Sequence, residues 1–340
     1  MKIDTRWTPA VVAAAEDLSP SVRSLHLRPE GGARPWTVGS HLRVQVRLGE
    51  RDDVRHYSLV GLPQHSLADG LYRIAVKRAR PGRGGSRFMA SLQPGDTLQI
   101  AGPDNHFELP VSAPHTLLVA GGIGITPMLG MALTLAPRGT PLRMLYAARD
   151  DAELVFADAL RAALGPRLQT FVDAHGERLD LEAEIGALPP HAQLLICGPV
   201  PLLQAAQAAW ARAGRTPAKL RFETFGSSGN RAAEPFRLRV PRHGLDVMVP
   251  ADRSLLQVLA EHGVETLSDC ERGECGLCAL DVVELQGEID HRDVFLSAAE
   301  KGDNRRLCAC VSRAADGRGG AALVIDSAWR PDAGSHAGAA

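Results

Sequence analysis

The sequence lacks an excess of charge of either sign. Its 340 residues include 38 lysines and arginines against 39 aspartates and glutamates. A protein without a net field is not drawn as a whole toward nucleic acid or an anionic membrane, so we expect neither as a partner. Any charge steering of a partner must therefore be local. The length exceeds what one ordinary hydrophobic core organises, and we expect two or three domains.

The sequence also lacks an export signal and an unbroken apolar run. The segment from Met1 to Asp4 carries an acid and no apolar stretch follows it, so we expect no signal peptide and a cytoplasmic location. The stretch from Thr116 to Pro137 has no charge, but four glycines and Pro127 interrupt it. We therefore expect a buried strand, loop and helix there rather than a membrane span. We expect the chain to be a monomer.

Cysteine is absent from the first 196 residues, and five of the six cysteines fall between residues 270 and 310. Without an export signal, such crowding favours a metal site over a disulfide framework. Cys270, Cys275 and Cys278 are separated by four and then two residues, and a further cysteine follows downstream, which is the plant-type [2Fe–2S] spacing. Gly273 and Gly276 let such a loop turn sharply and bring its amides to the sulfurs.

Two alternatives at this loop stay open on spacing alone. The first is a structural zinc site, although zinc loops more often pair cysteines two by two, and no second such pair appears in the sequence. The second concerns the fourth cluster ligand, which the spacing allows to be either Cys308 or Cys310. The cysteine that is not a ligand is expected to be a half-buried small residue without a role.

The chain divides into stretches of different texture. Up to about residue 105, short alternating apolar runs with frequent glycine and proline predict a small antiparallel barrel. From about residue 114, apolar strands alternate with helix-like segments such as 201–213, which predicts a parallel sheet covered on both faces. Later runs predict a hairpin, a helix and a strand, at 236–240 with 245–249, at about 254–262, and at 280–284. The expected domains are 1–108, 109–226 and 236–330, with a linker at 227–235 and a disordered tail at 331–340.

Two motifs in the first stretch suit a flavin that carries a phosphate. Arg55, His56, Tyr57 and Ser58 close a candidate barrel strand. The Arg55 fork can bind a phosphate, Tyr57 lies on the same side of the strand and can cover a flavin ring, and Ser58 can hydrogen-bond a flavin nitrogen. A glycine-rich turn that leads into a helix-like segment offers amides to a phosphate; its residues are Gly82, Gly84, Gly85 and Ser86. The alternatives are a chance strand motif and a surface loop, but the pair is more specific than either motif alone.

A second glycine turn predicts a nicotinamide site. After an apolar strand, the chain runs through Gly121, Gly122, Ile123, Gly124, Ile125, Thr126 and Pro127. We expect Thr126 as the N-cap and Pro127 as the first residue of a helix whose amides meet a pyrophosphate. The motif is not the Gly-x-Gly-x-x-Gly fingerprint, because Pro127 takes the third glycine position.

The carboxyl ends of two further strands complete the nicotinamide prediction, since ligands bind at that edge of open α/β sheets. Cys197, Gly198 and Pro199 end one strand, and Cys197 either lines the nicotinamide pocket or is a buried small residue. Arg149 and Asp150 follow another strand. An acid there disfavours a 2′-phosphate and leaves room for a ribose hydroxyl bond, whereas Arg149 argues the other way. We expect NADH rather than NADPH.

With these motifs in this order, the chain from about residue 8 to 328 resembles the phthalate dioxygenase reductase and vanillate demethylase reductase family. Further marks of the family lie at residues 102–107, 290–293 and 310–313. The resemblance implies a multidomain chain: an antiparallel β-barrel that binds FMN, an α/β parallel-sheet domain that binds NADH, and a C-terminal α+β ferredoxin domain of the β-grasp type. FMN rather than FAD is an inference from the family, because the sequence does not exclude an adenylate.

The resemblance also implies roles for single residues. Family members follow the last cluster cysteine, after one residue, with Ser and Arg, which places the fourth ligand at Cys310. Phe225 is expected to shield the flavin ring until nicotinamide displaces it, or else to be a core aromatic at a domain boundary. The expected FMN site also includes Ala75, Val76 and Lys77 at the end of a barrel strand.

The expected function is a relay of electrons. NADH gives up two electrons together and an iron–sulfur cluster accepts one, so a flavin must lie between them, and no residue need act as acid or base. The expected acceptor is a Rieske-type terminal oxygenase, and a cytochrome P450 or another one-electron acceptor is the alternative. A redox sensor would need an output segment, which we do not find in the sequence. A zinc-stabilised interaction domain fused to a nucleotide-binding fold is the remaining alternative.

Overall fold

The computed structural model describes residues 6–78, 84–225 and 233–326. The chain divides into two compact units, one that ends at Phe225 and one that begins at Gly226. Each unit has its own hydrophobic core. The linker expected at 227–235 falls largely outside the described residues, as do Gly82 and the expected tail.

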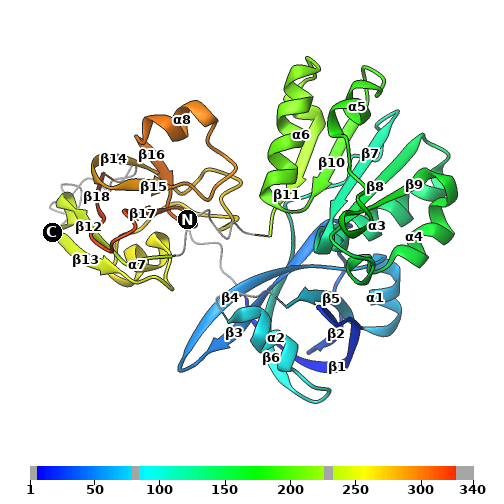
Figure 1. Ribbon diagram of the computed structural model, residues 1–340. Coiled ribbons are helices and arrows are strands. Elements are labelled where there is room, and N and C mark those ends of the chain that lie inside the picture. The colour runs from blue at the N-terminus through cyan, green and yellow to red at the C-terminus, as the bar shows by residue number, and fades with distance from the viewer. Residues whose placement is uncertain (1–5, 79–83, 226–232, 327–340) are drawn as a thin grey trace, which may run out of the picture. The chain divides into compact units, whose positions relative to one another are not determined.

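The first half of the N-terminal unit is a six-stranded antiparallel barrel (Figure 1, blue to cyan). The strand order is β4-β3-β6-β1-β2-β5, and a bridge between Leu59 and Ile74 joins its two ends, so the sheet closes on itself. Its elements are β1 (Thr8–Ser19), β2 (Val22–Pro29), β3 (Ser40–Leu48), β4 (Arg51–Ser58), α1 (Pro63–Asp69), β5 (Tyr72–Lys77), α2 (Gly85–Ser91) and β6 (Thr97–Asn105).

Alternation along β3 shows how the barrel core forms. Leu42, Val44 and Val46 are fully buried, while the residues between them are less buried polar side chains. A strand points successive side chains to opposite faces, so this period of two places one apolar face inside the barrel. Each such buried aliphatic side chain contributes about 1.5–3 kcal/mol.

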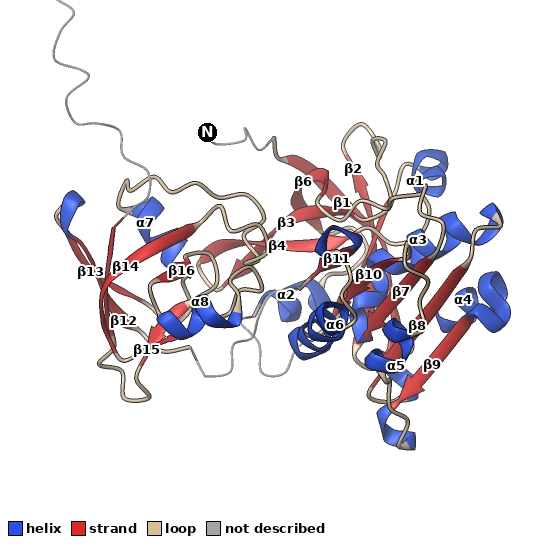
Figure 2. Ribbon diagram, turned by 90° about the horizontal axis from the view of Figure 1, so that it is seen from above, coloured by secondary structure: helices blue, strands red, loops and turns tan. Residues whose placement is uncertain are grey.

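The second half of the N-terminal unit is a five-stranded parallel sheet in the order β11-β10-β7-β8-β9. Its elements are β7 (Thr116–Gly121), α3 (Ile125–Leu135), β8 (Leu142–Ala148), α4 (Ala157–Leu164), β9 (Leu168–Val172), α5 (Leu181–Gly186), β10 (Gln193–Cys197), α6 (Val200–Arg212) and β11 (Leu220–Glu223). Parallel crossovers are right-handed, which puts α3 and α4 on one face and α5 and α6 on the other (Figure 2). The strand order therefore reverses between β7 and β10.

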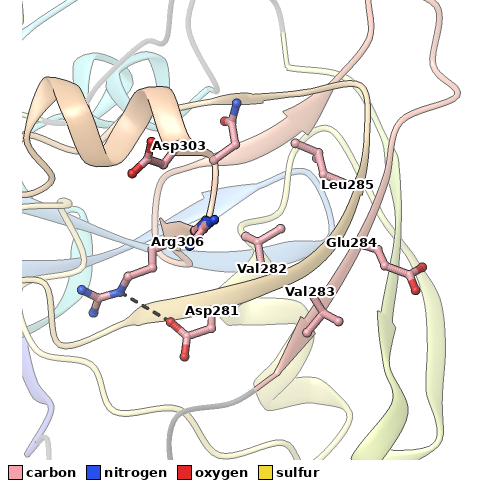
Figure 3. Close-up of a pocket in the computed structure, with 9 residues that line it drawn as sticks. Asp281, Val282, Val283, Glu284, Leu285, Asp303 and Arg306 are labelled. Atoms are coloured by element: carbon pink, nitrogen blue, oxygen red, sulfur yellow. Dashed lines mark ion pairs between the residues drawn. The ribbon is translucent and has the colours of Figure 1, made fainter.

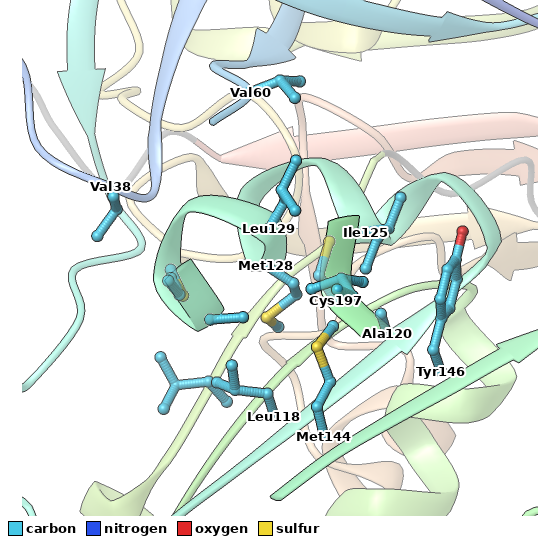
Figure 4. Packing of buried hydrophobic residues seen from close by; sticks show 14 of the residues in the cluster. Val38, Val60, Leu118, Ala120, Ile125, Met128, Leu129, Met144, Tyr146 and Cys197 are labelled. Atoms are coloured by element: carbon cyan, nitrogen blue, oxygen red, sulfur yellow. The ribbon is translucent and has the colours of Figure 1, made fainter. Parts of the chain in front are cut away.

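The barrel and the parallel sheet share one core through helix α3. Figure 4 shows this helix between Val38 and Val60 of the barrel and Leu118 and Met144 of the sheet. At Gly130 of α3, a Cβ atom would lie 2.3 Å from the carbonyl oxygen of Gly61, so only glycine allows this close approach to the barrel. The shared core makes the N-terminal unit a single body.

The C-terminal unit is built on a five-stranded mixed sheet in the order β13-β12-β18-β14-β16, with a small sheet of β15 and β17 beside it. Its elements are β12 (Phe236–Val240), β13 (Leu245–Val249), α7 (Leu255–Glu261), β14 (Ala279–Gln286), β15 (Glu288–Asp290), α8 (Ala298–Asp303), β16 (Arg306–Cys308), β17 (Arg313–Ala315) and β18 (Ala322–Asp326). The predicted hairpin, helix and strand are all present. Helix α7 begins at Leu255, and its N-cap is Ser254, whose hydroxyl accepts from the Gln257 amide in a capping box.

One predicted helix start is wrong. Helix α3 begins at Ile125 with Gly124 as its N-cap, not at Pro127 with Thr126 as its N-cap. The 3₁₀ turn η1 (Gly122–Gly124) already starts the helical run, so the Thr126 hydroxyl donates backward to the Ile123 carbonyl (3.0 Å) rather than accepting from an amide. The residues from 116 to 137 do form the expected buried strand, loop and helix. Within the described ranges, no helix has the length and apolar character to cross a membrane.

Candidate functional site

The switch between β7 and β10 brings the two predicted nicotinamide loops together. Cys197 at the end of β10 pairs with Ala120 at the end of β7. A Cβ atom on Gly124 would lie 2.1 Å from the carbonyl oxygen of Cys197, and one on Gly121 would lie 2.7 Å from Cδ of Pro199. These glycines are required because the turn after β7 lies directly against the loop after β10. A reversal of strand order at the carboxyl edge is where open α/β sheets bind ligands.

The start of helix α3 supplies amides at this edge. Gly122 has φ of +52°, a left-handed conformation that side chains rarely adopt, and it turns the chain from β7 into the helix. The first amides of a helix lack intrahelical acceptors and point along its positive end, so they suit a phosphate. Ile125, Thr126 and Pro127 are buried in this first turn.

Arg149 and Asp150 follow β8 at the same edge of the sheet, and both are exposed. The Asp150 carboxylate accepts from the amide of Glu153 (3.0 Å) and so caps the 3₁₀ turn η3 (Asp151–Glu153). The hydroxyl of Tyr146 donates to the Glu153 carbonyl (2.9 Å), and burial raises the pKa of Tyr146 well above its ordinary value. The chain after β8 is therefore held in one conformation.

In the barrel, Arg55 lies across the glycine turn that begins helix α2. A Cβ atom on Gly85 would be 2.8 Å from Nε of Arg55, and the N-cap Gly84 has φ of +92°. Nη1 of Arg55 pairs with Asp53 (2.8 Å) and donates to the Val54 carbonyl (2.8 Å). Nη2 is buried and has no hydrogen-bond partner among the described residues. A half-buried guanidinium with one buried, unpaired N–H donor beside glycine amides fits the phosphate of a flavin.

The pairing of β3 and β4 assigns the other flavin candidates to two sides of the strand. Tyr57 pairs with Leu42 and Arg55 with Val44, which places both on the side of the barrel core. Burial raises the pKa of the Tyr57 hydroxyl above its ordinary value. His56 lies on the opposite side, where its ring stacks on His41 with centroids 5.1 Å apart. Ala75 and Val76 are buried in β5, which lies next to β4 where the barrel closes.

A buried carboxylate joins the flavin strand to the nicotinamide edge. Ser58 donates its hydroxyl to Oε2 of Glu223 (2.9 Å), and the two residues are 4% and 1% exposed. Glu223 ends β11 and pairs with Cys197 on β10. The Ser58 hydroxyl hydrogen is therefore engaged, and towards a ligand this oxygen can only accept. Phe225, two residues after Glu223, is 39% exposed. No sequence motif marked Glu223, because a single acid at a strand end is common.

In the C-terminal unit, the loop between α7 and β14 folds around sulfur. Sγ of Cys270 accepts from the amides of Arg272, Glu274 and Cys275, each at 3.4 Å. Gly276 has φ of +74°, and a Cβ atom there would lie 2.2 Å from the ring of Phe295. The loop thus needs glycine for its turns, as predicted, and it directs amides at the sulfur of Cys270.

The cysteines of this unit form two groups. Cys270 and Cys275 share a hydrogen bond that lowers the pKa of Cys275 to about 6, while that bond and burial raise the pKa of Cys270. Cys278 lies against Cys308 and Cys310, whose thiols lower the pKa of Cys278 to about 3. Their bonds to Cys278, and their burial, raise the pKa of Cys308 and of Cys310. Two thiolates for each of two irons is what a [2Fe–2S] cluster requires, so the residues fit that group.

A buried polar network around Asp293 packs against the cysteine loop at Gly273. Asp293 accepts from the Leu296 amide (2.8 Å) and from the Ser312 hydroxyl (3.1 Å), and His291 lies 3.5 Å from it. Burial alone would raise the pKa of Asp293, but the His291 and Leu296 hydrogen bonds and the charge of Lys301 outweigh it, and the pKa is lowered. Asp293 is therefore ionised at neutral pH.

A shallow groove lies beside the strand that follows the cysteine loop (Figure 3). Residues of β14, the end of α8 and β16 line it, and Arg306 and Asp281 face each other across it with Nε and Oδ1 3.6 Å apart. The predicted cluster ligands lie outside its lining.

Two family models match the chain. Residues 9–109 match the oxidoreductase FAD-binding domain, and residues 239–315 match the 2Fe-2S iron-sulfur cluster binding domain. The chain is 35% identical over 328 residues to the phthalate 4,5-dioxygenase oxygenase reductase subunit of Pseudomonas putida, which covers 92% of this chain and 96% of that protein. It is 36% identical over 304 residues to the heme-dependent oxidative N-demethylase beta subunit of Ectopseudomonas mendocina strain ymp, covering 89% and 94%.

Two solved structures match nearly the whole chain. The first is phthalate dioxygenase reductase, described as a modular structure for electron transfer from pyridine nucleotides to [2Fe-2S], with a TM-score of 0.76 and 34% identity, covering 94% of this chain and 98% of that one. The second is an intact type IV self-sufficient cytochrome P450 monooxygenase, with a TM-score of 0.65 and 32% identity. That match covers 94% of this chain and 41% of the other.

Proposed function

Because this chain belongs to the phthalate dioxygenase reductase family, we propose that it carries electrons from NADH through FMN and a [2Fe–2S] cluster to a Rieske-type oxygenase or O-demethylase. The chain is an electron-transfer oxidoreductase with a flavin-binding domain and a 2Fe-2S domain. The 2Fe-2S match removes the zinc alternative. The proposal adds the identity of both carriers, the residues that hold them, and the acceptor.

One observation supports this path above the others. The Ser58–Glu223 hydrogen bond joins the predicted flavin strand to the carboxyl edge where the predicted nicotinamide loops meet. Transfer of a hydride needs donor and acceptor in contact, so the two sites have to share an edge. A bound flavin accepts two electrons together and releases them singly, which matches a hydride donor to a one-electron centre.

The residues of the N-terminal unit bind and orient. We assign the flavin phosphate to Arg55 and to the turn of Gly82, Gly84, Gly85 and Ser86, because the buried Nη2 of Arg55 needs a hydrogen-bond acceptor and lies beside this turn. Tyr57 and Phe225 would cover the ring, and Ser58 would accept from it. The glycine turn after β7 would hold the pyrophosphate, and Asp150 would favour NADH over NADPH. FMN rather than FAD rests on the family resemblance.

We assign the cluster to Cys270, Cys275, Cys278 and Cys310. The grouping of Cys270 with Cys275, and of Cys278 with two further thiols, supports one pair of ligands on each iron. Cys310 is preferred over Cys308 because the residues that follow Cys310 match the family pattern. The proposal includes a cytoplasmic, monomeric chain.

A haem protein is the second candidate for the acceptor. The match to an intact self-sufficient cytochrome P450 covers 94% of this chain, and a heme-dependent N-demethylase subunit is among the relatives. Such an acceptor would leave the path within the chain unchanged. Reduction of purified oxygenase and P450 candidates by the same reduced chain separates the two.

The central test is anaerobic rapid mixing of the purified chain with NADH. We expect flavin absorbance to bleach first and cluster absorbance second, and NADPH to react at least about tenfold more slowly. The Cys275→Ser variant should lack the cluster bands and keep the flavin step, because the two carriers belong to different units. A chain that stays oxidised with NADH, or contains no two-iron sulfide centre, would overturn the proposal.

A further inference from the structure

An ion pair lies over the glycine turn that is proposed to hold the pyrophosphate. Lys77 ends the barrel strand β5, and Glu153 ends η3 after the sheet strand β8. Nζ of Lys77 is 2.6 Å from Oε1 of Glu153. A Cβ atom on Gly122 would lie 3.8 Å from Nζ of Lys77 and 3.8 Å from Oε2 of Glu153. Both charges therefore lie in the space directly above Gly122.

The two partners differ in freedom. The Glu153 backbone is held by the Asp150 carboxylate on its amide (3.0 Å) and by the Tyr146 hydroxyl on its carbonyl (2.9 Å). Its side chain is 12% exposed, whereas that of Lys77 is 29% exposed. A lysine ammonium is a point charge on a flexible four-carbon stem, so Lys77 can turn to another anion, whereas the Glu153 carboxylate is attached to a fixed backbone and is less exposed.

This arrangement opposes a pyrophosphate that arrives at Gly122. The phosphates would meet the Glu153 carboxylate at close range in a partly buried place, where salt screens the repulsion only weakly. Lys77 can leave Glu153 to pair with a phosphate, but Glu153 then remains as a largely buried charge without its partner, which is unfavourable. The carboxylate thus favours the nucleotide-free state.

Building on the proposed function, we propose that Glu153 is a positioning residue that competes with the dinucleotide pyrophosphate for Lys77. It thereby sets how tightly NADH is held and how fast NAD⁺ leaves. The role is specific to the charge, because the amide of a glutamine can keep the fold of this loop but cannot repel a phosphate. In this proposal, Lys77 is assigned to the nucleotide rather than to the FMN site.

The test uses the full-length chain with its carriers bound. NAD⁺ and ADP-ribose, which both contain the pyrophosphate, are titrated into the native chain and the Glu153→Gln variant by calorimetry at low and high salt. We expect the variant to bind both ligands about tenfold more tightly at low salt and to keep most of that difference at high salt, because the repulsion acts in a partly buried place. The KM for NADH should fall, while flavin reduction at saturating NADH should be unchanged.

Asp151→Asn is the matched control. Asp151 lies two residues before Glu153, its carboxylate is 69% exposed, and it pairs with His175 (2.9 Å) away from Gly122. Its substitution removes the same charge and should leave the Kd values of NAD⁺ and ADP-ribose unchanged. A second variant, Lys77→Met, should weaken the binding of both ligands, because the phosphate then loses its cation.

The outcomes separate this inference from the proposed function. Three results would overturn the role of Glu153 and leave the proposed function standing. The first is unchanged or weaker ligand binding by Glu153→Gln, and the second is equally tighter binding by Asp151→Asn. The third is a lower Tm of Glu153→Gln and Lys77→Met without a change in the Kd of either variant. If the native chain bound neither NAD⁺ nor ADP-ribose, the nucleotide site and this inference would both be wrong.

Discussion

At the scale of single residues, the cysteines separate what spacing determines from what it leaves open. The sequence alone predicts Cys270, Cys275 and Cys278 as cluster ligands, because spacings of four and two residues recur in plant-type cluster loops. The structure does not choose between Cys308 and Cys310 as the fourth ligand, because both thiols lie against Cys278 and both are buried. Cys308 belongs to β16, where it pairs with Ala279, whereas Cys310 follows the strand. The choice of Cys310 therefore rests on the family pattern and needs a direct test.

Replacing each of these two cysteines by alanine distinguishes them. Cys310→Ala should lose the cluster, because one iron would keep a single thiolate, and iron and sulfide analysis should find less than about a tenth of the native content. Cys308→Ala should retain the cluster bands and lower the free energy of unfolding by only about 1 kcal/mol, the usual cost of a small change in a core. The reverse pattern of iron content would move the fourth ligand to Cys308.

At the scale of secondary-structure elements, the turn from β7 into α3 shows how sequence and packing combine. The glycines after β7 predicted a turn, but their spacing did not indicate which of them contact the loop after another strand. Gly124 meets the carbonyl of Cys197, and Gly121 meets the side chain of Pro199, 73 and 78 residues further along the chain. This close contact also explains why the predicted start of α3 was wrong. The turn η1 lies against the loop after β10 and already begins the helical run before Ile125.

Gly124→Ala tests this contact. Its Cβ would lie 2.1 Å from a backbone oxygen, which cannot move aside as a side chain can, so the start of α3 has to shift away from β10. We expect a loss of about 1–3 kcal/mol in stability and a weakened NADH affinity, with flavin content preserved. In differential scanning fluorimetry the Tm should fall by about 2–4 °C for each kcal/mol.

Gly186→Ala in α5 is the control for this prediction. A Cβ atom at Gly186 meets nothing within 4 Å, so this variant should match the native chain in Tm and in NADH affinity. If Gly124→Ala behaved like the control, the close approach of the two loops would not matter for the nucleotide site.

At the scale of the whole molecule, the described residues form three hydrophobic clusters, two in the N-terminal unit and one in the C-terminal unit. Every residue of the C-terminal core lies between Phe236 and Ile325, and the barrel and the parallel sheet share the core around α3. The predicted boundary between barrel and sheet thus separates two kinds of sheet that belong to one compact unit. The proposed hydride transfer would require these halves to be joined, because the Ser58–Glu223 bond and the glycine turn would have to hold one geometry.

A chain ended after Phe225 should therefore fold on its own. We expect residues 1–225 to bind FMN in about the native proportion and to be reduced by NADH at a rate within about threefold of the full-length chain, without cluster absorbance. It should fail to reduce a one-electron protein acceptor at a comparable rate. Insoluble protein, or flavin lost on purification, would show that the C-terminal unit is needed for the N-terminal core.

The sequence alone determined the order of the domains, the cluster loop, the two glycine turns that we propose bind phosphates, and most strands, because these depend on local periodicity and on glycine and cysteine spacing. Only the tertiary structure decided which distant groups meet. Glu223 with Ser58, Lys77 with Glu153, and His56 with His41 carry no motif, and each pairing depends on strand register and sheet order. Contacts between residues far apart in the chain follow from how its sheets and helices pack, which no short pattern encodes.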